Sequence, residues 1–523
     1  MRLTDLVPLV GPHQNAVEIL PIEITGIQFD SRQIEPGNVF VALEGGNADG
    51  HAYIPPAIQK GAIAVIGTQD LAITAVPYFR VKDTRESLAH VAAAFYGNPA
   101  RHLTVIGVTG TDGKTTTVNL IYNILLAAGI KAGMISTVNA VIGDEQIDTG
   151  FHVTTPEAPA IQKLLRRMVD SGLTHVVLET TSHGLAQHRA TACDYDIGVI
   201  TNITHEHLDY HGDYASYLGA KARLLTGLAC TPVKDGRQYR VAILNHDDIS
   251  YLPLKAILAD PTCANVRLVT YGMGEDNDLR GHDLQVTPDG IHFVLDWRGR
   301  SYWIDSSLVG AYNMHNILAA VGAAVAGLDL PMPVIVAGVR DLEGVPGRMQ
   351  RVDLGQDFLA IVDFAHTPNA LKVALETANR MKGAGRVIAV FGSAGLRDRQ
   401  KRRMMAATSV ELADLTILTA EDPRTESLDE ILAEMADEAV KHGGVEGQTF
   451  FRVPDRGDAI RKAVALAKPG DIVISCGKGH EQSMCFGETE YPWDDRTAMR
   501  AALAEHLAIP GPAMPFLPTQ NHN

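Results

Sequence analysis

GVTGTDGKTTT, residues 107–117, follows a run of strand-forming residues and precedes the helical stretch VNLIYNILLAAG. Gly110 and Gly113 allow backbone N–H groups to curl around phosphate oxygens, and the start of the helix adds a favourable dipole. Lys114 supplies a cation for terminal phosphates, and Thr115 can place a hydroxyl on Mg²⁺. Gly107 lies one residue too early, relative to Gly113, for the strict P-loop spacing. The order strand, Gly-Lys-Thr and helix still favours a nucleotide-binding loop over a plain glycine-rich turn.

Around this loop, short apolar runs alternate with Ala- and Leu-rich helical stretches. The runs in the first half of the chain are TVIGVTG (104–110), THVVLE (174–179), DIGVITN (196–202) and RVAILN (240–245). Those in the second half are FLAIVDF (358–364), RVIAVFG (386–392), ADLTILT (413–419) and GDIVISCG (470–477). Buried parallel strands have this continuous apolar character. We therefore predict an α/β protein with two doubly wound domains.

A chain of 523 residues is too long for one hydrophobic core. We predict a small N-terminal α/β domain (1–98), a central domain with a P-loop ATPase-type parallel sheet (99–343) and a C-terminal Rossmann-like domain (344–508). Residues 280–305 alternate apolar and polar side chains, which predicts antiparallel strands late in the central domain. The segment 509–523 contains four prolines, and we expect it to be unstructured.

Composition excludes several classes of function. The net charge of −16 argues against nucleic acid as the main partner. Five cysteines without a CxxC spacing exclude a disulfide framework and fit a reducing compartment. The beginning of the chain has no apolar leader, and the longest apolar run, residues 317–328, is too short to span a bilayer. We expect a cytoplasmic protein that does not bind membranes.

Several polar groups follow the predicted strands. Glu179 ends one of them, where ligands of parallel sheets bind, and the P-loop in the same sheet favours a role in Mg²⁺ binding over a cap or a salt bridge. His205, His207 and His211 can be metal ligands, or they can form a polar rim without metal. A lone helical lysine such as Lys221 is ordinarily a solvated charge. The basic run in FGSAGLRDRQKRR (391–403) suggests an anionic ligand or a solvated helix face.

The order of these motifs resembles the Mur ligase family, and within it the MurE ligases that add the third residue of the peptidoglycan stem. The resemblance runs from about Asp30 to Arg496. It is carried by FDSRQIEPGNVFVALEG with DGHAYI (29–54), the P-loop, TTPE (154–157), ETTSHGL (179–185), TNITHEHLDYHG (201–212), KAR (221–223), GAYNMHNILAA (310–320), GVPGRMQRV (344–352), DFAHTPNAL (363–371), FGSAGLRDRQKR (391–402), EDPRTE (421–426) and GKGHE (477–481).

The resemblance implies roles for the residues at matching positions. It implies ATP contacts for Gly110, Thr111, Asp112, Gly113, Lys114, Thr115, Thr116, Asn313, Arg348 and His366. It implies UDP-MurNAc-dipeptide contacts for Ser31, Arg32, Thr154, Thr155, Ser182 and Arg189. It implies amino-acid contacts for Arg397, Glu421, Asp422, Arg424, Gly477 and Glu481. It implies two Mg²⁺ sites built from Thr115, Glu179, His207 and a carbamylated Lys221, with Lys114, Lys221 and His207 as the catalytic residues.

The activity implied is ATP-dependent amide formation in cytoplasmic peptidoglycan precursor synthesis, by a protein that we expect to be a monomer. The D-Glu carboxylate of UDP-MurNAc-L-Ala-D-Glu becomes an acyl phosphate, which the amine of a free diamino acid then attacks. A folylpolyglutamate-type or cyanophycin-type ligase would share the P-loop and Mg²⁺ residues, but the N-terminal motifs and TTPE argue against both. A P-loop regulator of the GTPase kind is disfavoured because the chain has no Asn-Lys-x-Asp motif.

One position departs from the family pattern. Family members that add diaminopimelate have Asp-Asn-Pro-Arg where this chain has Glu421-Asp422-Pro423-Arg424. Arg424 can fork onto a distal carboxylate, as meso-diaminopimelate requires. Asp422 tends to repel that carboxylate and to favour the distal ammonium of lysine or ornithine, unless it pairs with Arg424. Diaminopimelate, lysine and ornithine therefore all remain open.

Overall fold

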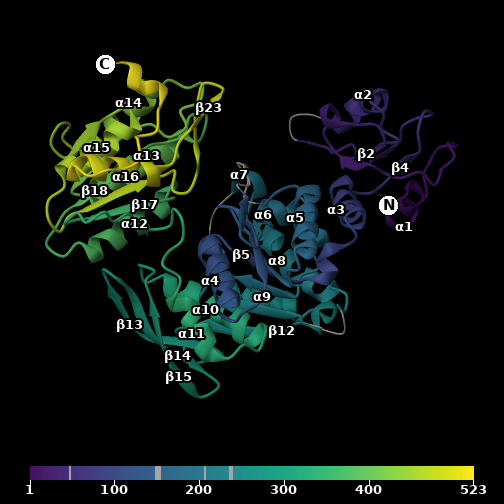
Figure 1. Ribbon diagram of the computed structural model, residues 1–523, viewed down its shortest axis with the longest axis horizontal. Helices are drawn as coiled ribbons and strands as arrows, with labels where there is room; N and C mark the ends of the chain where they lie inside the picture. The colour runs from purple at the N-terminus through teal and green to yellow at the C-terminus, as the bar shows by residue number, and fades with distance from the viewer. Residues whose placement is uncertain (46–48, 148–154, 205–207, 235–238, 523) are drawn as a thin grey trace. The chain divides into compact units, whose positions relative to one another are not determined.

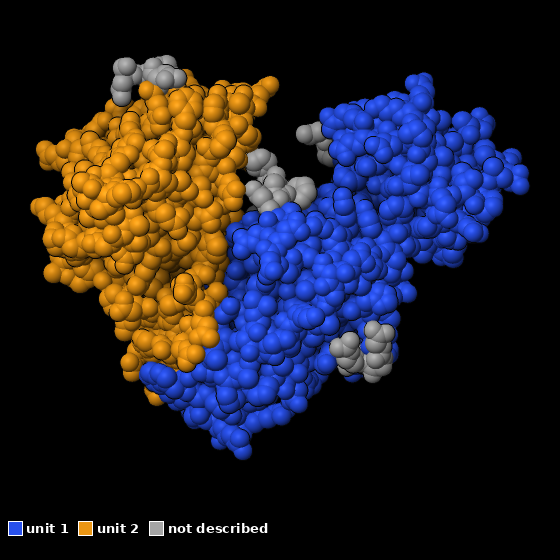
Figure 2. Space-filling view, in the orientation of Figure 1, with its two compact units in different colours: residues 1–282, 294–303, 314–339 blue, residues 283–293, 304–313, 340–523 orange. Residues whose placement is uncertain are grey.

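The computed structural model describes residues 1–45, 49–147, 155–204, 208–234 and 239–522 of the chain. Three main sheets are present, one in each predicted domain, and they confirm the α/β class (Figure 1). By compactness, the chain divides into two units (Figure 2). Unit 1 comprises residues 1–282, 294–303 and 314–339, and unit 2 comprises 283–293, 304–313 and 340–523.

The N-terminal sheet has four parallel strands, in the order β1 (Gly26–Gln28), β2 (Asn38–Val41), β3 (Ala64–Gly67) and β4 (Tyr78–Arg80). Its helices are α1 (Val7–Val10), α2 (Ile54–Gln59) and α3 (Thr84–Phe95). Two alanines of α3, Ala89 and Ala93, share a buried cluster with Ala158 and Ala192 of the next domain. This small-residue contact joins the first two predicted domains within unit 1.

The central sheet contains the P-loop strand. Its eleven strands, in spatial order, are β15 (Arg300–Ser306), β14 (Gly290–Trp297), β13 (Leu279–Thr287), β12 (Arg267–Gly272), β11 (Val241–Asn245), β10 (Ile197–Ile200), β5 (Thr104–Thr109), β9 (His175–Glu179), β6 (Ala132–Ile135), β7 (Ala140–Ile142) and β8 (Glu145–Ile147). The four strands predicted in the first half of the chain, now β5, β9, β10 and β11, are confirmed as buried neighbours in one parallel sheet.

The position of β5 explains why ligands are expected at one edge of this sheet. β5 lies between β9 and β10 in the sheet and pairs in parallel with both. The next strand in the chain, β6, lies beyond β9, whereas β10 and β11 extend the sheet on the other side of β5. Such a reversal of strand order opens a crevice at the carboxyl ends of the strands. The P-loop, Glu179 and the segment after β10 therefore meet at that edge.

Helices flank this sheet and fill the rest of the domain. They are α4 (Lys114–Ala127), α5 (Ala158–Asp170), α6 (Ser182–Ala186), α7 (Leu208–His211), α8 (Tyr214–Cys230), α9 (Tyr251–Leu258), α10 (Asn313–Gly322) and α11 (Met332–Arg340). Across the described part of the chain, no helix has both the length and the apolar character that crossing a bilayer requires.

The C-terminal sheet is doubly wound, as predicted. Its order is β16 (Gln350–Arg351), β17 (Leu359–Asp363), β21 (Ile472–Cys476), β18 (Val387–Phe391), β19 (Leu415–Leu418) and β20 (Phe450–Arg452). Its helices are α12 (Pro368–Met381), α13 (Arg399–Leu412), α14 (Leu428–Lys441), α15 (Arg456–Leu466) and α16 (Asp495–Leu507), and a hairpin of β22 (Ser483–Phe486) and β23 (Thr489–Pro492) follows β21. Ile472 and Ile474 belong to the core beneath α12–α14, and Val473 to the core beneath α15 and α16.

The segment after α16 differs from the expectation that it is unstructured. Leu517 is fully buried in the core beneath α15 and α16, and Met514 packs against the same core. The Thr519 hydroxyl donates a hydrogen bond of 2.7 Å to Asp455, the residue that caps α15. The prolines prevent a long α-helix here, and only the short 3₁₀ helix Pro518–His522 forms, but two apolar side chains provide enough contact to hold the segment on the domain.

Candidate active site

The loop after β5 has a backbone that only glycine permits at two positions. Gly113 has a φ of 80°, in the left-handed region, and lies directly before α4. A Cβ atom on Gly113 would collide with the amide oxygen of Asn316, and one on Gly110 would collide with the Thr201 hydroxyl. The loop is therefore closely packed on its neighbours.

Residues after β10 hold this loop from the other side. The N–H of Asp112 donates to the amide oxygen of Asn202 at 2.9 Å, and the Thr201 hydroxyl donates to the Asp112 carbonyl at 2.6 Å. The Thr111 hydroxyl lies 3.1 Å from the Tyr217 hydroxyl of α8 and accepts the N–H of Thr204 at 2.9 Å. These bonds give the loop a single shape before any phosphate binds.

Lys114 and Thr116 begin α4, where the sequence placed them. The Lys114 ammonium donates to the Thr111 carbonyl at 2.7 Å, so its charge already lies against the loop. Thr116 is buried in the first turn of the helix. The 14-residue helix α4 directs its N-terminal partial positive charge toward the same place.

Thr115 and Glu179 meet at the carboxyl edge of the sheet. Glu179 is 1% exposed, and its Oε1 accepts hydrogen bonds from Thr115 (3.1 Å) and from Thr137 (2.7 Å). The N–H of Thr137 donates to Oε2 at 3.0 Å. A hydroxyl and a carboxylate are the hard oxygen ligands that Mg²⁺ takes together with phosphate oxygens, so these two residues fit the ion. Thr137, which fixes the carboxylate, follows β6 and had no sequence signal.

Lys221 is not a solvated charge. It is 1% exposed on α8, and its ammonium donates to the Gly110 carbonyl at 2.6 Å and lies 4.7 Å from the centre of the Tyr217 ring. The structure therefore brings Lys221 to the P-loop across 111 residues of chain. The buried position rules out the solvated charge that helix composition alone suggests, whereas the metal-ligand role that the family resemblance implies stays a prediction.

The predicted histidine cluster is described only in part. His205 and His207 lie outside the described residues, as does Thr154. His211 stacks in an aromatic group, with ring centres 5.4 Å from His183, 4.8 Å from Tyr210 and 5.2 Å from Tyr217. Among the residues with a described position, no group of three or more His, Cys, Asp or Glu side chains is arranged to hold a metal.

Three of the residues expected to contact the dipeptide, Thr155, Ser182 and Arg189, form a group around α6. Ser182 begins this helix and is buried, and the preceding Thr181 caps it and shares a hydrogen bond of 3.0 Å with Thr155. Arg189 donates to the Thr155 carbonyl at 2.8 Å and pairs with Glu157 at 3.0 Å. Burial lowers the pKa of Arg189, although the neighbouring carboxylate opposes this change.

Ser31 and Arg32 belong to a short 3₁₀ turn of the N-terminal domain, Ser31–Gln33. The guanidinium of Arg32 is exposed and forks onto Asp30 with a shortest contact of 2.8 Å. The hydrogen bond from Arg32 lowers the pKa of Asp30. The turn therefore presents a hydroxyl and a cation on its surface, which are groups that can contact an anionic ligand.

Three further ATP candidates lie in unit 2. Asn313 is buried and donates to the Val309 carbonyl at 2.7 Å. Arg348 and His366 share one aromatic ring, because the guanidinium carbon lies 4.6 Å and the imidazole 4.5 Å from the centre of Phe364. Asn316, which contacts Gly113 in unit 1, was missed by sequence reasoning although it lies within the same GAYNMHNILAA motif.

Two of the amino-acid candidates, Asp422 and Glu481, pair with Lys478, a residue that sequence reasoning also missed. Lys478 is 1% exposed, and its ammonium lies 3.1 Å from Asp422 and 2.5 Å from Glu481. The backbone N–H of Cys485 also donates to Asp422, at 2.9 Å. The idea that Asp422 pairs with Arg424 is therefore wrong. The carboxylate is directed toward the buried lysine instead.

The remaining amino-acid candidates lie on three loops, which follow β18, β19 and β21. Glu421 follows β19, and burial raises the pKa of its carboxyl despite the neighbouring charge of Lys478. Gly477 follows β21 with a φ of 113°, a conformation that suits glycine. Arg424 has a φ of 54° and forms an isolated β-bridge with Phe486. Arg397 lies exposed before α13.

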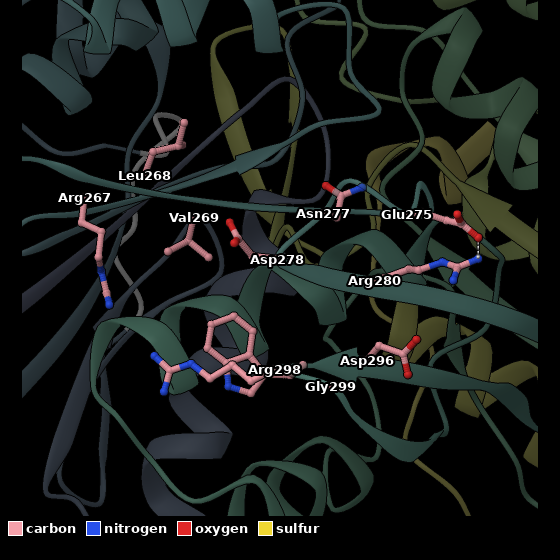
Figure 3. Close-up of a pocket in the computed structure, with 11 residues that line it drawn as sticks. Arg267, Leu268, Val269, Glu275, Asn277, Asp278, Arg280, Asp296, Arg298 and Gly299 are labelled. Carbon is pink, nitrogen blue, oxygen red and sulfur yellow. Dashed lines mark ion pairs between the residues drawn. The ribbon is translucent and has the colours of Figure 1, made fainter.

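A cavity of about 510 Å³ lies elsewhere, at strands β12–β14 and the loops beside them (Figure 3). Its charged lining mixes signs, because Arg267, Arg280 and Arg298 alternate with Glu275, Asp278 and Asp296. The lining contains none of the residues predicted for ATP, metal or amino acid. The candidate active site is therefore not this cavity. It is the P-loop group, which comprises the loop itself with Lys114, Thr115, Glu179 and Lys221.

Comparison with known proteins agrees with this arrangement. Residues 23–96 match the model described as "Mur ligase family, catalytic domain", residues 108–324 match "Mur ligase middle domain" and residues 347–479 match "Mur ligase, glutamate ligase domain". The three matches follow the order of the three sheets.

Full-length relatives extend the comparison. UDP-N-acetylmuramyl-tripeptide synthetase of Roseiflexus sp. (strain RS-1) is 42% identical, covering 97% of this chain and 99% of the relative. UDP-N-acetylmuramoyl-L-alanyl-D-glutamate--2,6-diaminopimelate ligase of Geobacillus thermodenitrificans is 39% identical, covering 92% and 95%. A solved structure of a ligase with this latter name shares 30% identity with a TM-score of 0.68, covering 97% and 99%. The chain belongs to the Mur ligase family.

Proposed function

We propose that the chain is an ATP-dependent amide ligase that adds a diamino acid, as the third stem residue, to UDP-N-acetylmuramoyl-L-alanyl-D-glutamate. The observation that carries this proposal is the convergence of Lys114, Lys221 and the Thr115–Glu179 pair on one phosphate loop. The names of relatives that cover nearly the whole chain support the choice of substrate.

In the first half of the reaction, the D-Glu γ-carboxylate attacks the γ-phosphorus of ATP. The bond from that phosphorus to the bridging oxygen breaks, which gives an acyl phosphate and ADP. Lys114 exchanges the Thr111 carbonyl for the γ-phosphate and offsets the charge that develops on it. Thr115 and Glu179 would hold Mg²⁺, and the ion would supply further charge neutralisation.

In the second half, the amine of the incoming amino acid attacks the acyl carbon. The amide bond forms, the bond to the phosphate oxygen breaks, and phosphate leaves while the amine loses a proton. Thr155, Ser182 and Arg189 orient the dipeptide beside Glu179, because α6 begins three residues after that carboxylate. Fixed geometry of this kind lowers the entropic part of the barrier.

We also propose that Lys221 forms a carbamate: the ammonium first loses one proton, and the free amine then attacks CO₂ and loses a second proton from its nitrogen. Burial of an ammonium is costly, and Lys221 is 1% exposed beside a phosphate loop. The carbamate would replace this cation with an anionic oxygen ligand for a second Mg²⁺. Glu179 and His207 would complete that site.

We infer that meso-diaminopimelate is the amino acid. Asp422 shares the Lys478 ammonium, at 3.1 Å, with Glu481, so part of its negative charge is offset and it repels a distal carboxylate less than a lone carboxylate would. Within the described residues, Arg424 has no ion-pair partner, and its guanidinium can fork onto that carboxylate. The names of the Geobacillus relative and of the solved ligase point the same way.

The test is phosphate release by the purified protein with ATP, Mg²⁺ and UDP-MurNAc-L-Ala-D-Glu. Meso-diaminopimelate, L-lysine and L-ornithine are offered one at a time, and mass spectrometry identifies the nucleotide product. A tripeptide product with diaminopimelate alone supports the whole proposal. A product with lysine or ornithine instead contradicts the choice of amino acid, and no product with any of them contradicts the third-residue reaction.

A further inference from the structure

A fully buried ion pair lies in the C-terminal domain, outside the groups described above. Arg456 is the first residue of α15 and Asp495 the first residue of α16, and both are 0% exposed. The guanidinium forks onto the carboxylate with Nε–Oδ1 and Nη2–Oδ2 distances of 2.7 and 2.6 Å. This pair holds the first turns of two adjacent helices together.

The same guanidinium also holds the ends of two strands. Nη1 donates to the carbonyl of Ala420 at 3.1 Å, and Nη2 donates to the carbonyl of Cys476 at 2.9 Å. Ala420 directly precedes Glu421 and Asp422, and Cys476 directly precedes Gly477 and Lys478. One rigid planar group therefore spans the roots of both loops that carry the proposed amino-acid contacts.

Asp495 is fixed by two further donors. The Ser475 hydroxyl donates to Oδ2 at 2.9 Å, and the indole N–H of Trp493 donates to Oδ1 at 2.8 Å. Burial opposes ionisation of Asp495, but the charge of Arg456 and these hydrogen bonds outweigh it and hold its pKa below the usual value. The carboxylate is thus a rigid support on which the guanidinium cannot rotate.

A buried ion pair is weak as a stabilising device, because desolvation of both ions offsets most of their attraction. Its distinctive property is geometric, since five N–H groups in one plane define the positions of their acceptors. We propose that Arg456, held by Asp495, is a positioning residue that sets the separation of the 421–424 and 477–481 loops and thereby the affinity for the incoming amino acid. This inference rests on the proposed function of those loops.

Arg456→Lys tests the inference, because lysine keeps the charge and loses the fork. We expect the KM for the amino acid to rise about tenfold, since small misplacements of binding groups have effects of this order. The KM values for ATP and for the nucleotide dipeptide should stay within about twofold of wild type, because no group proposed to contact them lies on these two loops. A role in stability alone would not change one KM selectively.

The matched control is Arg386→Lys. Arg386 forks onto Asp471 at 2.6 and 3.1 Å, and the pair lies where β18 and β21 begin, so it is at the opposite end of β21 from Arg456. We expect this variant to lose thermal stability without a change in any KM. Both variants are compared at a temperature where circular dichroism shows that they are folded.

Unchanged KM for the amino acid in Arg456→Lys, or an equal rise in all three KM values, overturns the inference. If Arg456→Lys does not fold, Ser475→Ala decides the question, because it removes only the hydroxyl that contacts both ions. We then expect a rise of about threefold in the same KM, and no rise overturns the inference. A wild-type enzyme without amino-acid-dependent turnover would instead refute the proposed function.

Discussion

Replacing Asp422 with asparagine removes a negative charge 3.1 Å from the buried Lys478 ammonium. The amide oxygen can still accept the hydrogen bonds of Lys478 and of the Cys485 N–H, so the shape of the loop is kept. The lost charge–charge contribution should lower the free energy of unfolding by about 1–2 kcal/mol. This is less than the loss of about 3–5 kcal/mol that is typical when a buried ion is left without a partner, because Glu481 remains beside Lys478.

The effect on amino-acid selection should be small. If Lys478 offsets Asp422 in the wild type, the preference for diaminopimelate over lysine should change by less than about tenfold in Asp422→Asn, which corresponds to less than about 1.4 kcal/mol. If the Asp422 charge instead reached the ligand, the same substitution would convert a lysine- or ornithine-adding enzyme toward diaminopimelate. In the first case the wild type prefers diaminopimelate, and in the second case it prefers lysine or ornithine.

The assay is phosphate release at saturating ATP and nucleotide dipeptide, with kcat/KM measured for each amino acid. The double substitution with Lys478→Met completes a thermodynamic cycle for the ion pair. Two results together would refute the reasoning. One is a coupling energy near zero when unfolding is measured in guanidinium chloride. The other is a change of more than a hundredfold in the preference for diaminopimelate over lysine in Asp422→Asn. Arg424→Lys is the matched control. It should reduce kcat/KM for diaminopimelate alone, because a lysine side chain at position 424 cannot fork onto the distal carboxylate of that substrate.

Four other predictions concern the P-loop group and acid stability. Lys114→Ala should reduce kcat about 10²–10³-fold in the phosphate assay, because the γ-phosphate loses its cation; normal turnover would contradict the P-loop assignment. Lys221→Ala should be about 10²-fold slower and partly rescued by added acetate, whereas full activity without rescue would exclude a carbamate. Thr137→Val should raise the Mg²⁺ concentration for half-maximal rate about tenfold, because Glu179 loses its hydroxyl donor at 2.7 Å; an unchanged Mg²⁺ titration would argue against Glu179 as a ligand. The pKa of Asp495 is lowered in the folded state, so its stabilising contribution is present above the usual pKa of 3.8 and is lost as the pH falls through the folded pKa. Below about pH 4, the free energy of unfolding of the wild type should therefore fall more than that of Asp495→Asn. Unfolding in guanidinium chloride at a series of pH values measures both.

Local features of the sequence account for much of the architecture. Continuous apolar runs at 104–110, 174–179, 386–392 and 470–477 became buried parallel strands, because a strand covered by helices on both faces has no polar side to show in the sequence. The phosphate loop was equally visible, since its glycines and Gly-Lys-Thr are contiguous. The segment 509–523 was misjudged, because its prolines disfavour a long α-helix but do not prevent Leu517 from packing in a core.

The sequence by itself determined the class of fold, the order of the three sheets and the position of the phosphate loop, because these depend on contiguous residues and on their periodicity. The tertiary structure decided which distant groups meet. Thr137 reaches Glu179, Lys221 reaches the Gly110 carbonyl, and Lys478 offsets Asp422 across 56 residues of chain. The effect of a charge depends on its neighbours and its burial, and neither can be obtained from the spacing of residues along the chain.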